Sequence, residues 1–342
     1  AGIEDFYGRR LFFSNLNIRD FTFKDQRIGD EAITNQWDKI GSVFNSEVKI
    51  TDQNRESLYA HGFFDPATQK MDYTAQLDHL SLVILETVIR KTFSNFHGDA
   101  SGKIKIHGTP QKILLNGTLE AAYAGLTIDY TRVSYHFTDS VHFLGDTILF
   151  DKIPIQDNSG NTGIFDGTIV HTNFQDMVYN LSLNTSQLVA INTTPQNNDQ
   201  FYGKVVARGR IDITGRGRKV QLSGSGTTLS GTNVNISLES QSEVEKYDFI
   251  RFVTEEDEEK QEFTFSEKEE SEFSLNLTIR ATPEARAKLI YNAQIGDVIT
   301  AQGEGILAFG MDPEGNITLS GNYTVERGDY LSFILPFQCY QK

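Results

Sequence analysis

Histidine is the residue type here best suited to metal binding or proton transfer. None of the seven histidines forms H-x-x-x-H or another close ligand spacing. His136 and His142 share a predicted strand face, but a separation of six residues along a strand spans roughly 20 Å, too far for one metal ion. The single cysteine, Cys339, adds no ligand cluster and cannot form an internal disulfide. We therefore interpret the histidines as structural and expect no metal and no other cofactor. The seven are His61, His79, His97, His107, His136, His142 and His171.

The motifs of nucleophilic and phosphoryl-transfer enzymes are absent from the sequence. There is no G-x-S-x-G elbow and no G-x-x-x-x-G-K-[ST] loop. The run from Gly224 to Gly226 lies between strand patterns, so no helix N-terminus is expected there to bind phosphate. Acidic residues are numerous, and a carboxylate pair in a cleft stays open as an alternative, although no local pattern points to one. We expect a protein that is not an enzyme.

A small group of basic residues could contact the phosphate of a lipid headgroup. The alternative, which we favour, is an ordinary solvated strand face followed by a turn. The group comprises Arg208, Arg210, Arg216, Arg218 and Lys219.

The net charge of the chain is concentrated in one segment. The 342 residues carry 31 basic and 46 acidic side chains, a charge of −15. Residues 239–272 hold 14 acidic and 4 basic residues, a net of −10, which leaves −5 for the rest. We interpret this segment as a solvated loop, with a calcium site as a less favoured alternative. A net negative charge also argues against a nucleic-acid-binding surface.

The elements that would position any functional side chain are β-strands. Apolar and polar residues alternate over most of the length, as in Lys103–His107 and Val234–Leu238, and a period of two places the apolar side chains on one face of a strand. Apolar runs are short, so no membrane-spanning helix is predicted. The one helical pattern covers residues 80–96, where we predict a short amphipathic helix that plugs one end of the β core; a membrane-surface or partner-docking helix is the less favoured alternative.

An internal repeat is the most specific pattern in the sequence. Residues 102–117 and 209–224 match as G-[KR]-I-x-I-x-G-x-x-x-K-[IV]-x-L-x-G without a gap. Residues 305–321 form a third copy with one extra turn residue, and a fainter fourth begins at Gly167. Each copy is predicted to be a β-hairpin with one apolar face. These apolar faces supply our candidate binding residues: Ile104, Ile106, Ile113, Leu115, Ile211, Ile213, Val220, Leu222, Leu307, Phe309, Ile317 and Leu319.

Hairpins with one apolar face must stack on neighbours or curl around that face. We therefore predict an all-β fold in which repeated hairpins build an elongated, curled sheet, a solenoid-like trough; a pair of ordinary β-sandwiches is the weaker alternative. The predicted segments are an N-terminal β segment (1–98) ending in the short helix, the hairpin trough (99–238), the acidic loop (239–272) and a C-terminal β segment (273–342). The start at Ala1-Gly2, without an initiator Met or signal peptide, suggests a piece of something longer or a mature form.

The C-terminal segment resembles the C-terminal domain of the TamB family, from the translocation and assembly module of the Gram-negative envelope. The upstream stretch through residues 98–102, and the strand pattern at 247–253, resemble the Bacteroidota branch of the family, so the likeness covers roughly residues 10–335. Residues 335–342 depart from the family pattern. The matching elements are Thr282–Ala285, Gly296-Asp297, Gly303–Gly305, Gly321–Val325 and Gly328–Tyr330.

The resemblance implies a periplasmic protein, anchored in the inner membrane by an N-terminal helix that this sequence lacks. It implies a rolled sheet that reaches toward the outer membrane and a partner there, the BamA-like barrel TamA. It also implies a role in phospholipid transport between membranes and in outer-membrane biogenesis. The repeat is compatible with this role, because an apolar trough could hold acyl tails while headgroups stay in water.

Two other functions remain as alternatives. The chain could be a chaperone or interaction module for outer-membrane β-barrels or autotransporters, adding strands to its exposed edges. It could also be a surface carbohydrate-binding or adhesive β-domain. A dry core, in which the repeat side chains only fill each other's space, is the structural alternative to a lipid-binding trough.

Overall fold

The computed structural model describes residues 2–6, 9–23, 26–87, 93–174, 176–198, 201–237, 272–292 and 297–331. Nineteen strands within these ranges form one sheet. The predicted all-β class is confirmed, and one continuous sheet takes the place of the two-sandwich alternative. The predicted segment boundaries stay predictions, and the acidic loop and the strand pattern at 247–253 lie outside the described residues.

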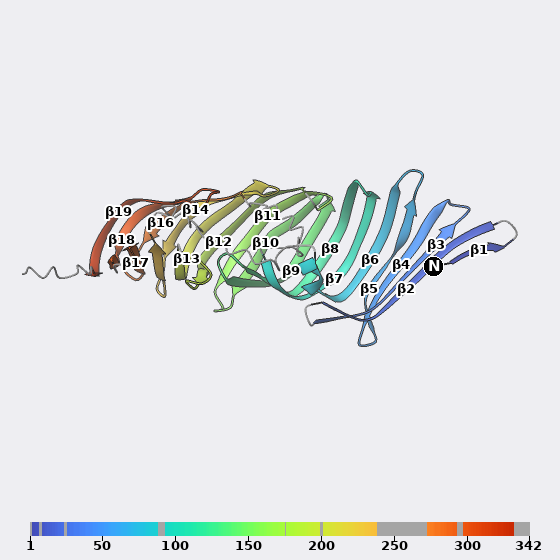
Figure 1. The fold of residues 1–342 in the computed structure, drawn as a ribbon, viewed down its shortest axis with the longest axis horizontal. Coiled ribbons are helices and arrows are strands. Elements are labelled where there is room, and N and C mark those ends of the chain that lie inside the picture. Colours follow the sequence, from blue (N-terminus) through green and yellow to red (C-terminus); the bar gives the residue numbers. More distant parts are fainter. Residues whose placement is uncertain are drawn as a thin grey trace, which may run out of the picture.

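The first half of the sheet is a run of antiparallel hairpins in sequence order (Figure 1). Its strands are β1 (Gly2–Phe6), β2 (Arg9–Phe23), β3 (Gln26–Asp38), β4 (Val43–Asp52), β5 (Arg55–Asp65), β6 (Lys70–Ser81), β7 (Phe93–Thr109), β8 (Lys112–Ile128) and β9 (Val133–Gly145).

The second half continues the run and then becomes mixed. Its strands are β10 (Thr147–Asp157), β11 (Thr162–Thr172), β12 (Asp176–Thr193), β13 (Phe201–Arg216), β14 (Lys219–Thr228), β15 (Asn233–Ser237), β16 (Glu272–Ala281), β17 (Arg286–Asn292), β18 (Asp297–Met311) and β19 (Ile317–Leu331). Strands β14 and β15 pair with the two halves of β13, and β16 and β17 pair with the two halves of β18. The β14–β16 and β15–β17 pairs are parallel.

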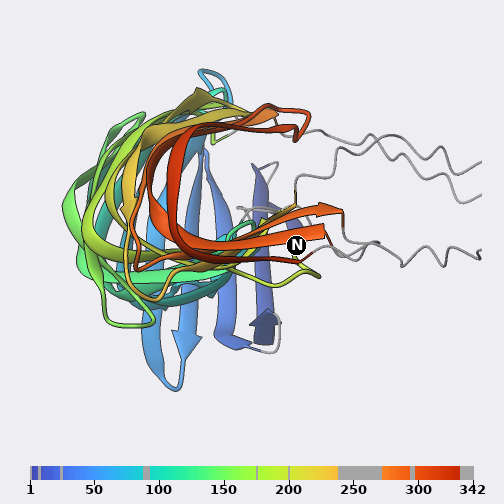
Figure 2. The same ribbon diagram turned by 90° about the vertical axis from the view of Figure 1, so that its left-hand side faces the viewer.

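The strands are up to 18 residues long, and they bend (Figure 2). The sheet curls about its long axis into an open C, seen end-on in Figure 2. β-bulges bend strands, because one extra residue on one strand is left unpaired. Five bulges carry a non-glycine residue with positive φ at the extra position: Asp20, His79, Asn95, Tyr123 and Lys152.

Four of these bulges are stabilised by the same type of hydrogen bond. The backbone N–H of the bulge residue donates to a side-chain oxygen on the following strand, as Tyr123 does to Thr138 Oγ1 at 3.0 Å. Left-handed backbone costs a residue with a Cβ roughly 1–2 kcal/mol, and the hydrogen bond offsets part of that cost. The other three pairs are Asp20 with Asp30, His79 with Ser101, and Lys152 with Asp166.

The predicted helix over residues 80–96 is wrong where the structure describes that range, at residues 80–87 and 93–96. A six-residue 3₁₀ helix, η1 (Leu82–Thr87), stands in its place, and β7 already begins at Phe93. The β-branched side chains of this stretch favour extended backbone over a long helix. Val83, only 3% exposed, packs against Ile28 and Ile50, so the segment does cover an apolar cluster.

No helix in the described ranges is long and apolar enough to cross a lipid bilayer.

Candidate functional site

The three full copies of the repeat fold into hairpins with the same register. In β7–β8, Ile104 lies opposite Gly117 and Ile106 opposite Leu115. The corresponding pairs recur in β13–β14 and β18–β19, so each full copy of the repeat is a β-hairpin, as predicted. These pairs are Ile211 with Gly224, Ile213 with Leu222, Leu307 with Gly321, and Phe309 with Leu319.

The last glycine of the repeat has a steric cause. A Cβ at Gly117, Gly224 or Gly321 would clash with the backbone carbonyl oxygen of Lys103, Arg210 or Ile306 respectively. The two backbones can approach closely only where the second strand carries no side chain. The spacing of the repeat therefore encodes a contact between backbones as well as an apolar face.

The apolar side chains of the repeats lie on the concave side of the sheet, which we call the inner apolar face. Alternation on β13 puts Ile211 and Ile213 on this face and Arg210 and Asp212 on the outer face. Paired positions extend the face into two rows across β12, β13, β14, β16, β18 and β19. One row is Leu181, Ile213, Leu222, Leu275, Met311 and Ile317; the other is Leu183, Ile211, Gly224, Leu277, Phe309 and Leu319.

The structure brings the second and third repeats together but keeps the first apart. Ile104 and Ile106 on β7 belong to rows that continue through Ala75 and Tyr73 on β6. Strands β9 to β12 separate β8 from β13, so the first repeat lies about 24 Å along the sheet from the second.

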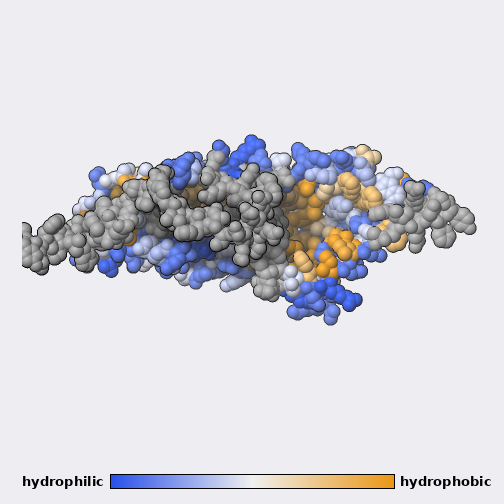
Figure 3. Space-filling view, viewed as in Figure 1, coloured by the Kyte–Doolittle hydropathy of each residue, from blue (hydrophilic) through white to orange (hydrophobic). Residues whose placement is uncertain are grey.

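Most of the predicted residues keep part of their surface exposed. Ile104, Leu115 and Phe309 are buried, at 6%, 9% and 9% exposure. The other nine are half-buried: Ile106, Ile113, Ile211, Ile213, Val220, Leu222, Leu307, Ile317 and Leu319. Figure 3 looks toward the concave side and shows apolar side chains gathered in the hollow over β6–β8. A partly exposed apolar face of this kind can bind an apolar chain.

The C-terminal end of the inner apolar face is filled by side chains from opposite walls of the curl. Phe201, at the start of β13, is 4% exposed and meets Phe309 of β18 edge-on, with ring centroids 6.3 Å apart. Tyr130, in the β8–β9 turn, lies 5.7 Å from Phe201 and 5.5 Å from Phe273 between ring centroids. Tyr130 is 40% exposed, and its partial burial among these rings raises its pKa, although a hydrogen bond with Asn198 acts the other way.

Several residues of this face were not predicted. Leu275, Leu277 and Phe273 stand in a clean alternation on β16 that the period of two could have identified. Tyr130 and Phe201 have no such signal, because they reach the face from a turn and from the opposite wall. Among the described residues, no group of three or more His, Cys, Asp or Glu side chains could hold a metal ion.

Comparison with known proteins identifies one family. The family model described as the TamB C-terminal domain matches residues 151–337, more than half of the chain. This range contains the second and third repeats and excludes the first, so the likeness of residues 10–150 and the Bacteroidota branch stay predictions. No curated protein and no solved structure matches the chain.

Proposed function

The chain belongs to the TamB C-terminal domain family, and we propose that its curled sheet holds phospholipid acyl chains against the inner apolar face. The family acts in outer-membrane biogenesis within the translocation and assembly module. Its members are transport and assembly proteins that are anchored in the inner membrane and extend through the periplasm. The family is not known for enzymes.

The observation that carries the proposal is the continuity of the inner apolar face. Two rows of paired positions cross six neighbouring strands from β12 to β19, and every position is an apolar side chain except Gly224. Hydrogen-bonded strands are about 4.8 Å apart, so an extended apolar chain lying across the strands meets a new row position at each step. Half-buried residues such as Ile213 and Leu222 leave surface for that chain to cover.

The energetics favour retention without a fixed binding site. Each methylene buried from water contributes about 0.8 kcal/mol, so one tail is held by the sum of many equivalent contacts. A tail held in this way can slide along the sheet, because no single contact fixes it. The charged headgroup would stay in water beyond the rim of the C.

The packed C-terminal end limits where a tail would lie. Tyr130, Phe201 and Phe273 already occupy the space beside Phe309. We therefore assign the tail to the part of the inner apolar face that lies before this packed end, where Ile211, Ile213 and Leu222 are half-buried. Phe309, Ile317 and Leu319 belong to the packed end itself.

The remaining parts of the proposal follow the family. We propose that this chain lies in the periplasm as part of an inner-membrane-anchored protein. Its outer-membrane partner would be the BamA-like barrel TamA, and phospholipid its cargo.

Native mass spectrometry of the gently purified chain tests the proposal. We expect co-purifying phospholipid in the wild type and its loss in Ile211→Glu or Ile106→Glu, because a carboxylate on the inner apolar face opposes tail binding. Thr214→Glu is the matched control, since it adds the same charge to the exposed side of β13. Lipid that stays bound to a folded Ile211→Glu variant would reject the proposal, and circular dichroism establishes that the variant is folded.

A second function has one observation in its favour. Strand β19 pairs with β18 alone among the described strands, and its outer residues are exposed, with Val325 at 52%. An open strand edge can add a strand from a barrel or autotransporter precursor. Crosslinks from positions on β19, and none from the inner apolar face, would favour this chaperone function.

A further inference from the structure

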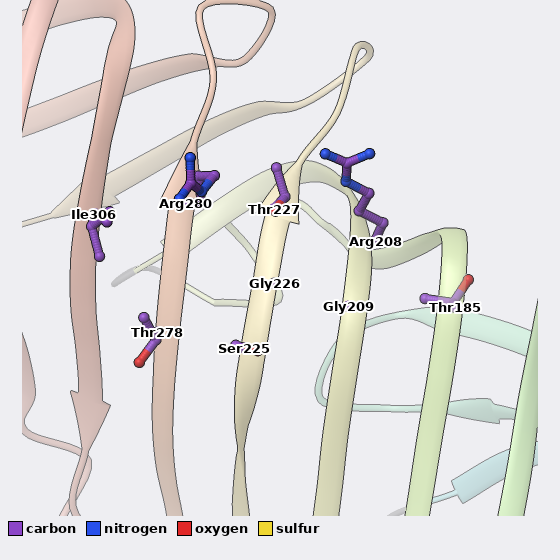
Figure 4. Close-up of a pocket in the computed structure, with 9 residues that line it drawn as sticks. All are labelled: Thr185, Arg208, Gly209, Ser225, Gly226, Thr227, Thr278, Arg280 and Ile306. Carbon is purple, nitrogen blue, oxygen red and sulfur yellow. The ribbon is translucent and has the colours of Figure 1, made fainter.

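The outer face of the sheet carries a hollow lined by two arginines and several hydroxyl groups. Its volume is ≈ 460 Å³, and it spans β12, β13, β14, β16 and β18. Arg208 on β13 and Arg280 on β16 flank Thr227 of β14, which pairs with both of them. In Figure 4 the two guanidinium groups stand at one level on either side of Thr227.

The two arginines differ from their basic neighbours in having no internal partner. Arg210 donates to Asp212 at 2.7 Å, and Arg216 donates to Asp176 at 2.6 Å. Arg218 and Lys219 also have contacts. By contrast, neither Arg208 nor Arg280 forms a hydrogen bond or ion pair with any described residue, and both are exposed. Only one member of the basic group noted in the sequence, Arg208, is therefore left with a guanidinium available to a ligand.

The spacing of the two arginines suits a tetrahedral anion. Two strand-to-strand steps place their Cα atoms about 10 Å apart, a gap that two long side chains can close around one phosphate. Arginine binds phosphate through two parallel N–H donors. The hydroxyl groups of Ser225, Thr227 and Thr278 add donors at the same hollow. Gly209 and Gly226 also line the hollow.

We propose that Arg208 and Arg280 form a binding site for a phosphate group on the outer face. The ligand class is a phosphate ester, either a lipid headgroup or a free organic phosphate. The site lies on the opposite side of the sheet from the inner apolar face. Phosphate binding there can therefore be tested independently of acyl-chain binding.

Phosphorus NMR line broadening with the full chain tests the site. The probes are inorganic phosphate, glycerophosphoglycerol and vesicles of phosphatidylglycerol. We expect broadening in the wild type and about a tenfold loss of affinity in the double variant R208Q/R280Q, because both positively charged guanidinium groups are lost. The double variant R208K/R280K should lose less affinity, since lysine keeps the positive charge and lacks only the two parallel N–H donors of a guanidinium group.

Arg210→Gln is the matched control on the same face of β13, because its guanidinium is already paired with Asp212. It should change the affinity by less than about twofold. Binding of glycerophosphoglycerol and of vesicles identifies a lipid headgroup as the ligand, whereas binding of inorganic phosphate alone identifies a small free anion. Equal binding by R208Q/R280Q and Arg210→Gln, or no broadening of any probe by the wild type, would overturn the proposal.

Discussion

The hydroxyl of Tyr130 donates a hydrogen bond to Sδ of Met311 at 3.2 Å, joining a turn and a strand that lie 181 residues apart. Met311 is 7% exposed and belongs to the same apolar cluster as Phe201 and Phe309. Tyr130 comes from the turn between β8 and β9, whereas Met311 is the last residue of β18. One ring thus ties the β8–β9 turn to the C-terminal end of the inner apolar face.

Truncating Tyr130 should weaken this end of the sheet. We expect Tyr130→Ala to lower the free energy of unfolding by about 2 kcal/mol, because the ring contacts with Phe201 and Phe273 are lost. Tyr130→Phe keeps the ring and should cost less than about 1 kcal/mol. Urea denaturation of both variants measures the difference. Equal losses would mean that the hydroxyl, and not ring packing, holds the turn in place.

The bulge hydrogen bonds can be tested at Thr138. Thr138→Val keeps the shape but removes the acceptor for the N–H of Tyr123, so we expect a loss of about 1 kcal/mol. Thr138→Ser keeps the oxygen and serves as the control. Hydrogen exchange at the Tyr123 amide should accelerate in the valine variant only. Unchanged exchange there would show that the oxygen does not protect the bulge.

Two turns of identical pattern give a matched pair of aspartates. Asp157 and Asp312 each begin a D-x-x-G-N turn, and each accepts hydrogen bonds from the backbone and side chain of the asparagine four residues on. Asp157 is only 1% exposed and also accepts from the N–H of Val189 at 2.9 Å. Asp157→Ala should cost about 3 kcal/mol, because it leaves a buried donor unpaired, and Asp312→Ala clearly less. Thermal unfolding that shifts equally in both variants would contradict the role of burial.

Asp157 also predicts the response to acid. Burial alone would raise the pKa of Asp157, but hydrogen bonds from Asn161, Val189 and Ser159 outweigh it and lower the pKa. The contribution of Asp157 is therefore present above the unfolded-state value near 3.9 and is lost only as pH falls through the lower folded value. Between pH 7 and pH 5, the stability difference between wild type and Asp157→Ala should stay constant. A difference that shrinks in that range would contradict a lowered pKa.

His171 predicts a loss of stability at mildly acidic pH. The ring is 3% exposed, stacks on Phe174 with ring centroids 4.1 Å apart, and neither ring nitrogen has a partner among the described residues. Burial lowers its pKa, with Asp146 opposing. The unfolded chain then binds the proton more readily, so stability falls as pH drops below about 6.5. His171→Phe keeps the stacking and should flatten the pH dependence of the melting temperature between pH 7.5 and 5.5; an unchanged slope would assign it to other groups.

The repeated hairpins could be predicted from the sequence, because each one depends on residues that are close together in the chain. Alternation placed Ile104, Ile211 and Leu307 on one face, and the turn residues marked the hairpins, so the fold class and the three hairpins followed from short-range patterns. The helix over 80–96 failed for a related reason. Its apolar spacing fits a helix, but its β-branched residues and the alternation that resumes at Phe93 favour strand.

The parts that sequence reasoning missed depend on contacts between distant residues. The bulge at Tyr123 needs an acceptor from the next strand, and Tyr130 needs the curl of the sheet to bring Met311 within reach. Arg280 joins Arg208 only because β16 pairs in parallel with β14. Periodic patterns along the chain do not predict these contacts, since each contact depends on how separate strands and turns are placed relative to one another.

The inner apolar face is the central feature of the account, and two adjacent residues of β13 test it directly. Ile213 lies on that face and Thr214 on the outer face. A photoreactive benzophenone side chain at each position, irradiated in cells and analysed by mass spectrometry, would report what each face touches. We predict phospholipid adducts from position 213 and none from position 214. Protein adducts alone, or no lipid adduct at position 213 in a folded chain, would contradict acyl-chain binding on the concave side.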